Sequence, residues 1–213
     1  MNYLPESIQA KINEMCNAGN TSTDLPPAHS SSSASIQSQI CGVPHRYNNV
    51  SFADTQTCLN EVTKKFALEG NGVLIIIGDN GTGKTRLVSA CINERIAREL
   101  CGGRYISCSY EVCPLIRSSR SFSANKSEME TLREFYTTPF LVLDEVGKGD
   151  DIQTSKAFVQ NVLAARYDNN LPTVIATNLD KDGIVDFVGK EISSRLKETA
   201  RMYALNNKDW RSK

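Results

Sequence analysis

One glycine-rich stretch of eight residues constrains the fold of this chain more than any other feature. It consists of Gly78, Asp79, Asn80, Gly81, Thr82, Gly83, Lys84 and Thr85. An apolar run at residues 73–77 precedes it and a helical pattern at residues 86–100 follows it. Glycines let the backbone curl until successive N–H groups point inward, and a helix N-terminus attracts anions. The spacing G-x-x-x-x-G-K-[ST] in this context predicts a phosphate-binding loop rather than a plain turn with a solvated lysine.

The chemistry expected of this loop is the binding of a nucleotide triphosphate such as ATP. Lys84 is expected to reach the β- and γ-phosphates, and Thr85 to place its hydroxyl on Mg²⁺. The other residues of the loop are expected to contribute backbone N–H groups.

Two adjacent carboxylates, Asp144 and Glu145, follow a second apolar run at residues 140–143. Burying them unpaired would be costly, so they either meet a cation or face solvent. In an open parallel sheet the carboxyl ends of the strands border the ligand crevice. Together with the phosphate-binding loop, the pair predicts a Walker B motif in which Asp144 holds Mg²⁺ and Glu145 polarises the attacking water.

Asn178, with its polar amide, directly follows a further largely apolar run at residues 173–177. Asn at a strand end is often a turn former. Its expected place at the same edge of the sheet favours a role in holding the γ-phosphate or the attacking water.

Strand and helix patterns alternate along the chain, which predicts an α/β fold with a doubly wound parallel sheet. We expect strands at residues 73–77, 104–108, 140–143 and 173–176. We expect helices at residues 51–66 (buried stripe Cys58, Leu59, Val62 and Phe66), 86–100, 112–116, 128–135, 152–169 and 184–203. The last of these is expected to be a basic, solvated helix.

Length and composition predict one main domain with a small appendage, since the chain has 213 residues of which 40% are hydrophobic. Residues 1–20 carry apolar side chains at helical spacing, which predicts a short helix that could dock on a partner. Residues 21–40 are rich in Ser and Pro and are expected to form a linker. Residues 41–213 are expected to form the ATPase domain.

Charge and cysteine usage restrict the classes of partner. Twenty-four basic and twenty-four acidic residues cancel, so DNA binding would need a local patch, and a neutral chain favours self-association. Seven cysteines without a C-x-x-C pair predict buried thiols in a reducing cytoplasm. The N-terminus lacks a signal-like pattern and no apolar run is long enough for a bilayer, so we expect a cytoplasmic protein without a membrane partner.

A polar loop is the candidate contact for single-stranded DNA. Residues 117–127 combine Arg117, Arg120 and Lys126 with one aromatic side chain, Phe122. Cations bind phosphates and an aromatic face stacks on a base. A solvated surface loop remains an alternative of similar weight.

The order of these motifs resembles the AAA+ ATPases of the DnaC type, the bacterial helicase loaders. The resemblance runs from about Cys41 to the C-terminus, and includes residues 42–52, Gly147 after the two carboxylates, Ser194-Arg195-Leu196 and Asp209-Trp210-Arg211. It implies a five-stranded sheet in the order 5-1-4-3-2. One departure is Glu191, where such loaders often carry a second arginine.

The resemblance also implies roles and partners. Asn178 would be the sensor 1 residue, Arg195 an arginine finger acting on the ATP of a neighbouring subunit, and Arg211 a sensor 2-like residue. The implied function is ATP-dependent loading of a DnaB-like replicative helicase on single-stranded DNA by a homo-oligomer. The alternatives are a transposition helper ATPase of the IstB type, and a nucleotide-gated adaptor or inhibitor of the helicase with negligible turnover.

Overall fold

The computed structural model describes residues 31–55, 57–100 and 103–205. The helix predicted within residues 1–20, the first part of the predicted linker and Arg211 lie outside these residues. Five parallel strands form one sheet in the order β2-β3-β4-β1-β5, which confirms the predicted order read from the opposite edge. The strands are β1 (Val73–Ile77), β2 (Arg104–Ser107), β3 (Leu141–Val146), β4 (Thr173–Thr177) and β5 (Ala200–Ala204).

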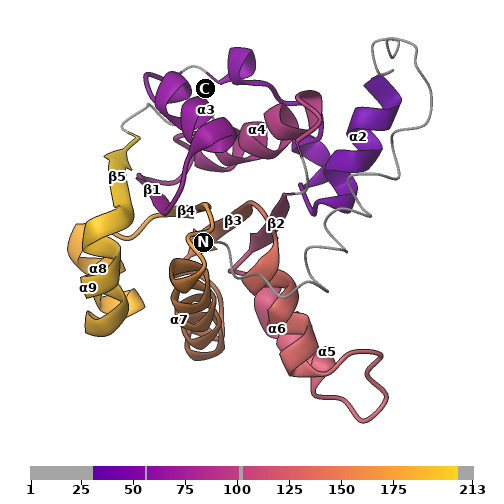
Figure 1. Ribbon diagram of the computed structural model, residues 1–213, viewed down its shortest axis with the longest axis vertical. Coiled ribbons are helices and arrows are strands. Elements are labelled where there is room, and N and C mark those ends of the chain that lie inside the picture. Colours follow the sequence, from indigo (N-terminus) through magenta and orange to yellow (C-terminus); the bar gives the residue numbers. More distant parts are fainter. Residues whose placement is uncertain (1–30, 56, 101–102, 206–213) are drawn as a thin grey trace.

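Helices cover both faces of the sheet, as a doubly wound fold requires (Figure 1). On one side lie α2 (Ser31–Ile40), the short 3₁₀ turns His45–Tyr47 and Phe52–Asp54, α3 (Asn60–Glu69) and α4 (Lys84–Ala97). On the other side lie α5 (Val112–Ser119), α6 (Glu128–Thr137), α7 (Ile152–Asp168), α8 (Lys181–Val188) and α9 (Lys190–Thr199).

The strands divide their side chains between two apolar cores because successive residues of a strand point to opposite faces. In β1, Leu74 and Ile76 pack with the core under α3 and α4, whereas Val73 and Ile75 pack with the core of α5 to α9. Strands buried on both faces are near-continuous apolar runs, which is the pattern of these segments.

Pairing register brings the carboxyl ends of four strands together. Ile77 of β1 pairs with Thr177 of β4, which also pairs with Val146 of β3, and Ser107 of β2 pairs with Asp144 of β3. The glycine-rich loop, the two carboxylates and Asn178 therefore meet at one edge of the sheet. This arrangement positions the candidate site.

The prediction of a linker at residues 21–40 is wrong for its last ten residues, because residues 31–40 form helix α2. This helix packs against α4, and the buried hydroxyl of Ser38 donates to Asn93 Oδ1 at 2.7 Å. Ser-rich composition predicts a solvated tether, but contacts with a distant helix supply partners that the local sequence does not display.

The helix predicted at residues 51–66 is shorter than expected. Ser51 caps a 3₁₀ turn at Phe52–Asp54, and the α-helix begins only at Asn60, whose side chain bonds the carbonyls of Phe52 and Thr55. Cys58 is consequently exposed, while Leu59 is buried. The expectation of buried thiols holds for Cys91 and Cys108.

The prediction of a single helix at residues 184–203 is also wrong. Gly189, with φ +84°, separates α8 from α9, and the chain becomes extended from Ala200 to form β5. Backbone pairing with β1 outweighs the helical propensity of these mixed polar residues. No helix of the described residues is long and apolar enough to cross a membrane.

Candidate functional site

A cavity of about 440 Å³ opens where the strand ends meet. Its walls come from the glycine-rich loop, the ends of β3 and β4, and the segment before α3. The lining residues are Arg46, Tyr47, Asp54, Thr55, Thr57, Asn80, Gly81, Thr82, Gly83, Lys84, Thr85, Arg86, Asp144, Glu145, Lys148, Asn178 and Leu205.

Two glycines of the loop, Gly83 and Gly78, illustrate different reasons why the backbone requires this residue. Gly83 has φ +96° and precedes α4, so its left-handed conformation excludes most side chains although the space beside it is open. At Gly78 there is no space for a side chain, because a Cβ atom would lie 2.5 Å from the carbonyl oxygen of Leu205. The chain after β5 therefore packs directly on the start of the loop.

Lys84 is the first residue of α4, and its ammonium group is held by the loop itself. Nζ donates to the carbonyl oxygens of Gly78 and Asp79, both at 2.7 Å. Burial, together with the neighbouring ammonium of Lys148, lowers the pKa of Lys84 to about 8. Both hydrogen-bond partners are neutral carbonyls, so they do not neutralise this charge. An anionic phosphate fits the cradle.

Asp144 lies at the centre of the site and is only 1% exposed. Its carboxylate accepts hydrogen bonds from the Tyr105 hydroxyl at 2.6 Å and from the Glu145 N–H at 2.8 Å, and the Thr85 hydroxyl lies close enough to stabilise its charged form. Burial raises the pKa of Asp144, and these hydrogen bonds oppose the rise. Carboxylate and hydroxyl oxygens are ligands that Mg²⁺ prefers, so the contact between Asp144 and Thr85 fits that ion.

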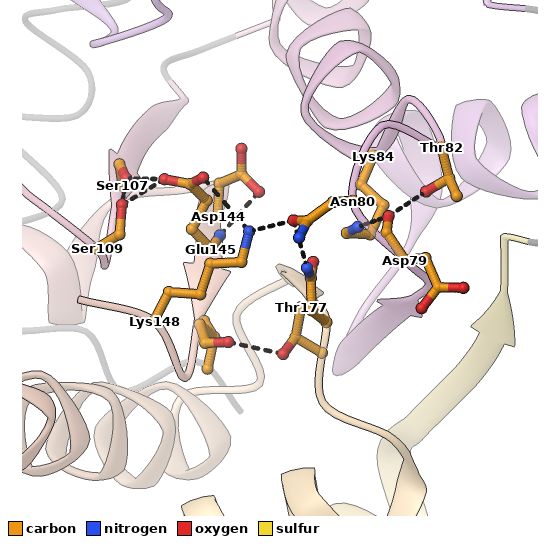
Figure 2. Close-up of polar contacts among 12 residues, drawn as sticks. Asp79, Asn80, Thr82, Lys84, Ser107, Ser109, Asp144, Glu145, Lys148 and Thr177 are labelled. Carbon is orange, nitrogen blue, oxygen red and sulfur yellow. Dashed lines mark hydrogen bonds and ion pairs between the residues drawn. The ribbon is translucent and has the colours of Figure 1, made fainter. Parts of the chain in front are cut away.

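An irregularity in β3 sets the direction of the Glu145 side chain. The register with β4 shifts between Leu143 and Val146, and Glu145 has φ +56°, a conformation uncommon outside glycine. Its carboxylate accepts hydrogen bonds from the Ser107 hydroxyl at 2.9 Å and from the Ser109 hydroxyl. Figure 2 shows these contacts. Burial favours a higher pKa, but the serine hydroxyls and Lys148 outweigh it, so the pKa of Glu145 lies below its usual value.

Asn178 meets the glycine-rich loop directly. Its amide nitrogen donates to Asn80 Oδ1 at 2.6 Å, and Lys148 Nζ donates to the same oxygen at 2.8 Å. Figure 2 shows Lys148 extending from the end of β3 toward Asn80. The predicted residues Lys84, Thr85, Asp144, Glu145 and Asn178 thus all line one cavity.

Sequence patterns missed several residues of the site. Lys148 follows the two carboxylates by three positions but resembles a solvated lysine in a loop. Tyr105, Ser107 and Ser109 belong to β2 and its end, and only the pairing of β2 with β3 carries them to the carboxylates. Arg46 lies near the Tyr47 ring, 5.7 Å from its centroid, in a segment far from the loop in sequence.

Arg195 is not among the residues that line the cavity. On α9 its guanidinium pairs with Glu191 at 2.9 Å and with Asp168 at 3.6 Å, and lies 6.0 Å from the centre of the Tyr167 ring. Glu191 stands where the DnaC-type loaders often carry a second arginine. In this chain it forms an ion pair with Arg195.

Residues 120–127 of the proposed DNA loop lie between α5 and α6 and extend beyond both helices in Figure 1, whereas Arg117 lies in the last turn of α5. Phe122 is fully exposed. Arg120 makes two hydrogen bonds to Glu128, and Lys126 pairs with Glu134. These carboxylates reduce the local positive field, and DNA binding by the loop stays a prediction.

Fold and site together define the class of protein. A 2-3-4-1-5 parallel sheet with a glycine-rich loop after β1 and paired carboxylates at the end of β3 is an AAA+ P-loop NTPase. Residues 32–190 match the family described as IstB-like ATP binding protein, and the chain belongs to this family.

Curated relatives include replicative helicase loaders. The DnaC loader of Buchnera aphidicola (from Acyrthosiphon pisum) is 25% identical over 166 residues, which are 73% of this chain and 66% of the relative. The DnaI loader of Bacillus subtilis is 28% identical over 154 residues, or 69% of this chain and 47% of the relative. The chain thus spans less than two thirds of the length of these relatives.

Solved structures share the fold. A crystal structure of the DnaC helicase loader has a TM-score of 0.59 at 21% identity, covering 78% of this chain and 100% of that chain. AMPPCP-bound DnaA from Aquifex aeolicus has a TM-score of 0.60 at 18% identity, covering 76% of this chain and 51% of that chain.

The hydrogen bond from Tyr105 to Asp144 is expected to stabilise the folded protein. Tyr105→Phe leaves a buried carboxylate without one donor, so the free energy of unfolding should fall by about 1–3 kcal/mol. Urea denaturation measures the change. Tyr136→Phe is the control, since the hydroxyl of this half-buried tyrosine makes no hydrogen bond within residues 31–55, 57–100 and 103–205, and its loss should change stability by less than about 0.5 kcal/mol. Equal stability of Tyr105→Phe and wild type would contradict the expectation.

Proposed function

We propose that this protein is an ATP-dependent DNA replication protein of the helicase-loader type. It binds and hydrolyses ATP with Mg²⁺ and helps to place a replicative hexameric helicase on single-stranded DNA in the cytoplasm. The observation that carries the ATPase half is the meeting of Lys84, Thr85, Asp144, Glu145 and Asn178 at one cavity. The loader half is supported by relatives named as helicase loaders.

Each residue of the site has a role in this proposal. Lys84 and the loop N–H groups bind the phosphates, and Thr85 and Asp144 hold Mg²⁺, which when bound offsets negative charge on the phosphates. Glu145 polarises the attacking water, and its lowered pKa keeps it ionised at neutral pH, as this role requires. Asn178 orients the terminal phosphate or the water.

Two substitutions separate binding from turnover. Lys84→Ala should remove most of the affinity for nucleotide, because the cation in the loop's own cradle is lost. Glu145→Gln should bind nucleotide with near wild-type affinity but stop hydrolysis, because the amide cannot accept a proton. Equilibrium binding and phosphate release measure the two effects. Unchanged affinity of Lys84→Ala would contradict the assignment of the loop.

Arg195 is proposed to act on the ATP of a neighbouring subunit in a homo-oligomer. Its position outside the cavity of its own chain is compatible with this role. Its partners Glu191 and Asp168 are surface carboxylates, and exposed ion pairs are weak enough to be exchanged for a phosphate.

A mixing experiment tests this role. Arg195→Ala should bind ATP normally and lose most hydrolysis, because an arginine supplied by a neighbour contributes a factor of about 10³–10⁵ in rate where it has been measured. Adding Lys84→Ala subunits should restore part of the activity, since one variant supplies the arginine and the other an intact ATP site. No recovery at any mixing ratio would argue against action between subunits.

A transposition helper ATPase is the second candidate, because the matched family is described as IstB-like. Affinity capture of the host's replicative helicase on the immobilised full-length chain discriminates between the two. A loader should retain the helicase more strongly with ATP than without it, and Lys84→Ala should lose the difference. Absence of capture under both conditions would favour the transposition helper.

A further inference from the structure

A second ammonium group faces the candidate nucleotide cavity beside that of Lys84. Lys148 follows β3 after Gly147, whose φ of +85° turns the chain, and its backbone N–H donates to the Glu145 carbonyl. The turn directs the side chain back across the end of the sheet. Nζ reaches Asn80 Oδ1 at 2.8 Å, and lies 3.7 Å from Glu145 Oε1.

The two ammonium groups repel each other. Lys148 is one of the causes that lower the pKa of Lys84, so the two positive charges are close enough to interact. Two cations at one cavity are costly unless anions accompany them. Asp144, Asp79 and Glu145 supply part of the balance, but Asp144 already accepts hydrogen bonds from Tyr105 and the Glu145 N–H, and Glu145 Oε1 lies 3.7 Å from Lys148 Nζ, beyond ordinary hydrogen-bond distance.

Two donors converge on one neutral oxygen. Asn80 Oδ1 accepts both Lys148 Nζ and the Asn178 amide. A single amide oxygen carries no net charge, so it attracts an ammonium less strongly than an anionic phosphate oxygen does. A phosphate oxygen at this position would accept hydrogen bonds from Lys148 and Asn178 more favourably than Asn80 Oδ1 does.

We propose that Lys148 binds the terminal phosphate of a nucleoside triphosphate and so distinguishes the triphosphate from the diphosphate. The proposal rests on the proposed ATP site. The phosphate that is transferred must lie beside Glu145, which polarises the attacking water, and Lys148 is the neighbour of Glu145 in the cavity. Lys84 belongs to the start of α4, so the two cations approach the phosphates from different elements.

Equilibrium binding of two nucleotides provides the test. Calorimetry with Mg²⁺ compares the non-hydrolysable triphosphate AMPPCP with ADP on wild type, Lys148→Met and Lys148→Arg. Lys148→Met should lose at least about tenfold in AMPPCP affinity, the equivalent of one charge-assisted hydrogen bond, and change ADP affinity by less than twofold. Lys148→Arg should retain most of the preference. Lys156→Met is the control, because this half-buried lysine donates to the Asp186 carbonyl on α8 and does not line the cavity.

Other outcomes overturn the proposal. Equal losses for AMPPCP and ADP would assign Lys148 to holding the shape of the loop through Asn80. Unchanged affinity for both would leave it a surface lysine. Lys148→Gln repeats the measurement in a second uncharged variant, and unfolding curves of all variants confirm that each is folded. A wild type that binds neither nucleotide would instead refute the ATP site itself, and the proposal with it.

Discussion

The buried carboxylate of Asp144 is the constraint on which the rest of the site depends. It connects three elements, because Tyr105 of β2 and the backbone of β3 donate hydrogen bonds to it and the Thr85 hydroxyl of α4 lies beside it. A carboxylate that is 1% exposed must be surrounded by donors or meet a cation. Satisfying it therefore sets how β2, β3 and the start of α4 approach one another, and the same approach closes one wall of the cavity.

Around this centre the polar groups are arranged by small departures from regular backbone. The irregularity in β3 turns Glu145 toward Ser107 and Ser109, and the left-handed glycine that follows turns Lys148 toward the loop. Asn80 then links Lys148 with Asn178. The result is a connected polar network at the end of the sheet, in which each charged group has neutral or opposite partners and the cavity remains open.

Much of the fold could be predicted because its strands are buried on both faces. The apolar runs at residues 73–77 and 140–143 have few other structures available to them, and both form the expected strands. The family resemblance implied a fifth strand beside β1, but the local sequence did not locate it, because Arg201, Met202 and Tyr203 form no apolar run and their pairing with β1 is visible only in three dimensions. Helix α2 was not predicted for a similar reason, since the hydrogen-bond partner of Ser38 lies on α4, 55 positions away in the sequence.

By itself, the sequence determined the chemistry of the loop and of the strand ends. Glycine spacing before Lys84 and Thr85, and two carboxylates after an apolar run, are local features whose physical meaning does not depend on distant residues. Only the tertiary structure decided which side chains surround them. Tyr105, Ser109 and Lys148 join the site because strand order and register bring separate segments together, and hydrogen bonds between such segments leave no trace in local composition.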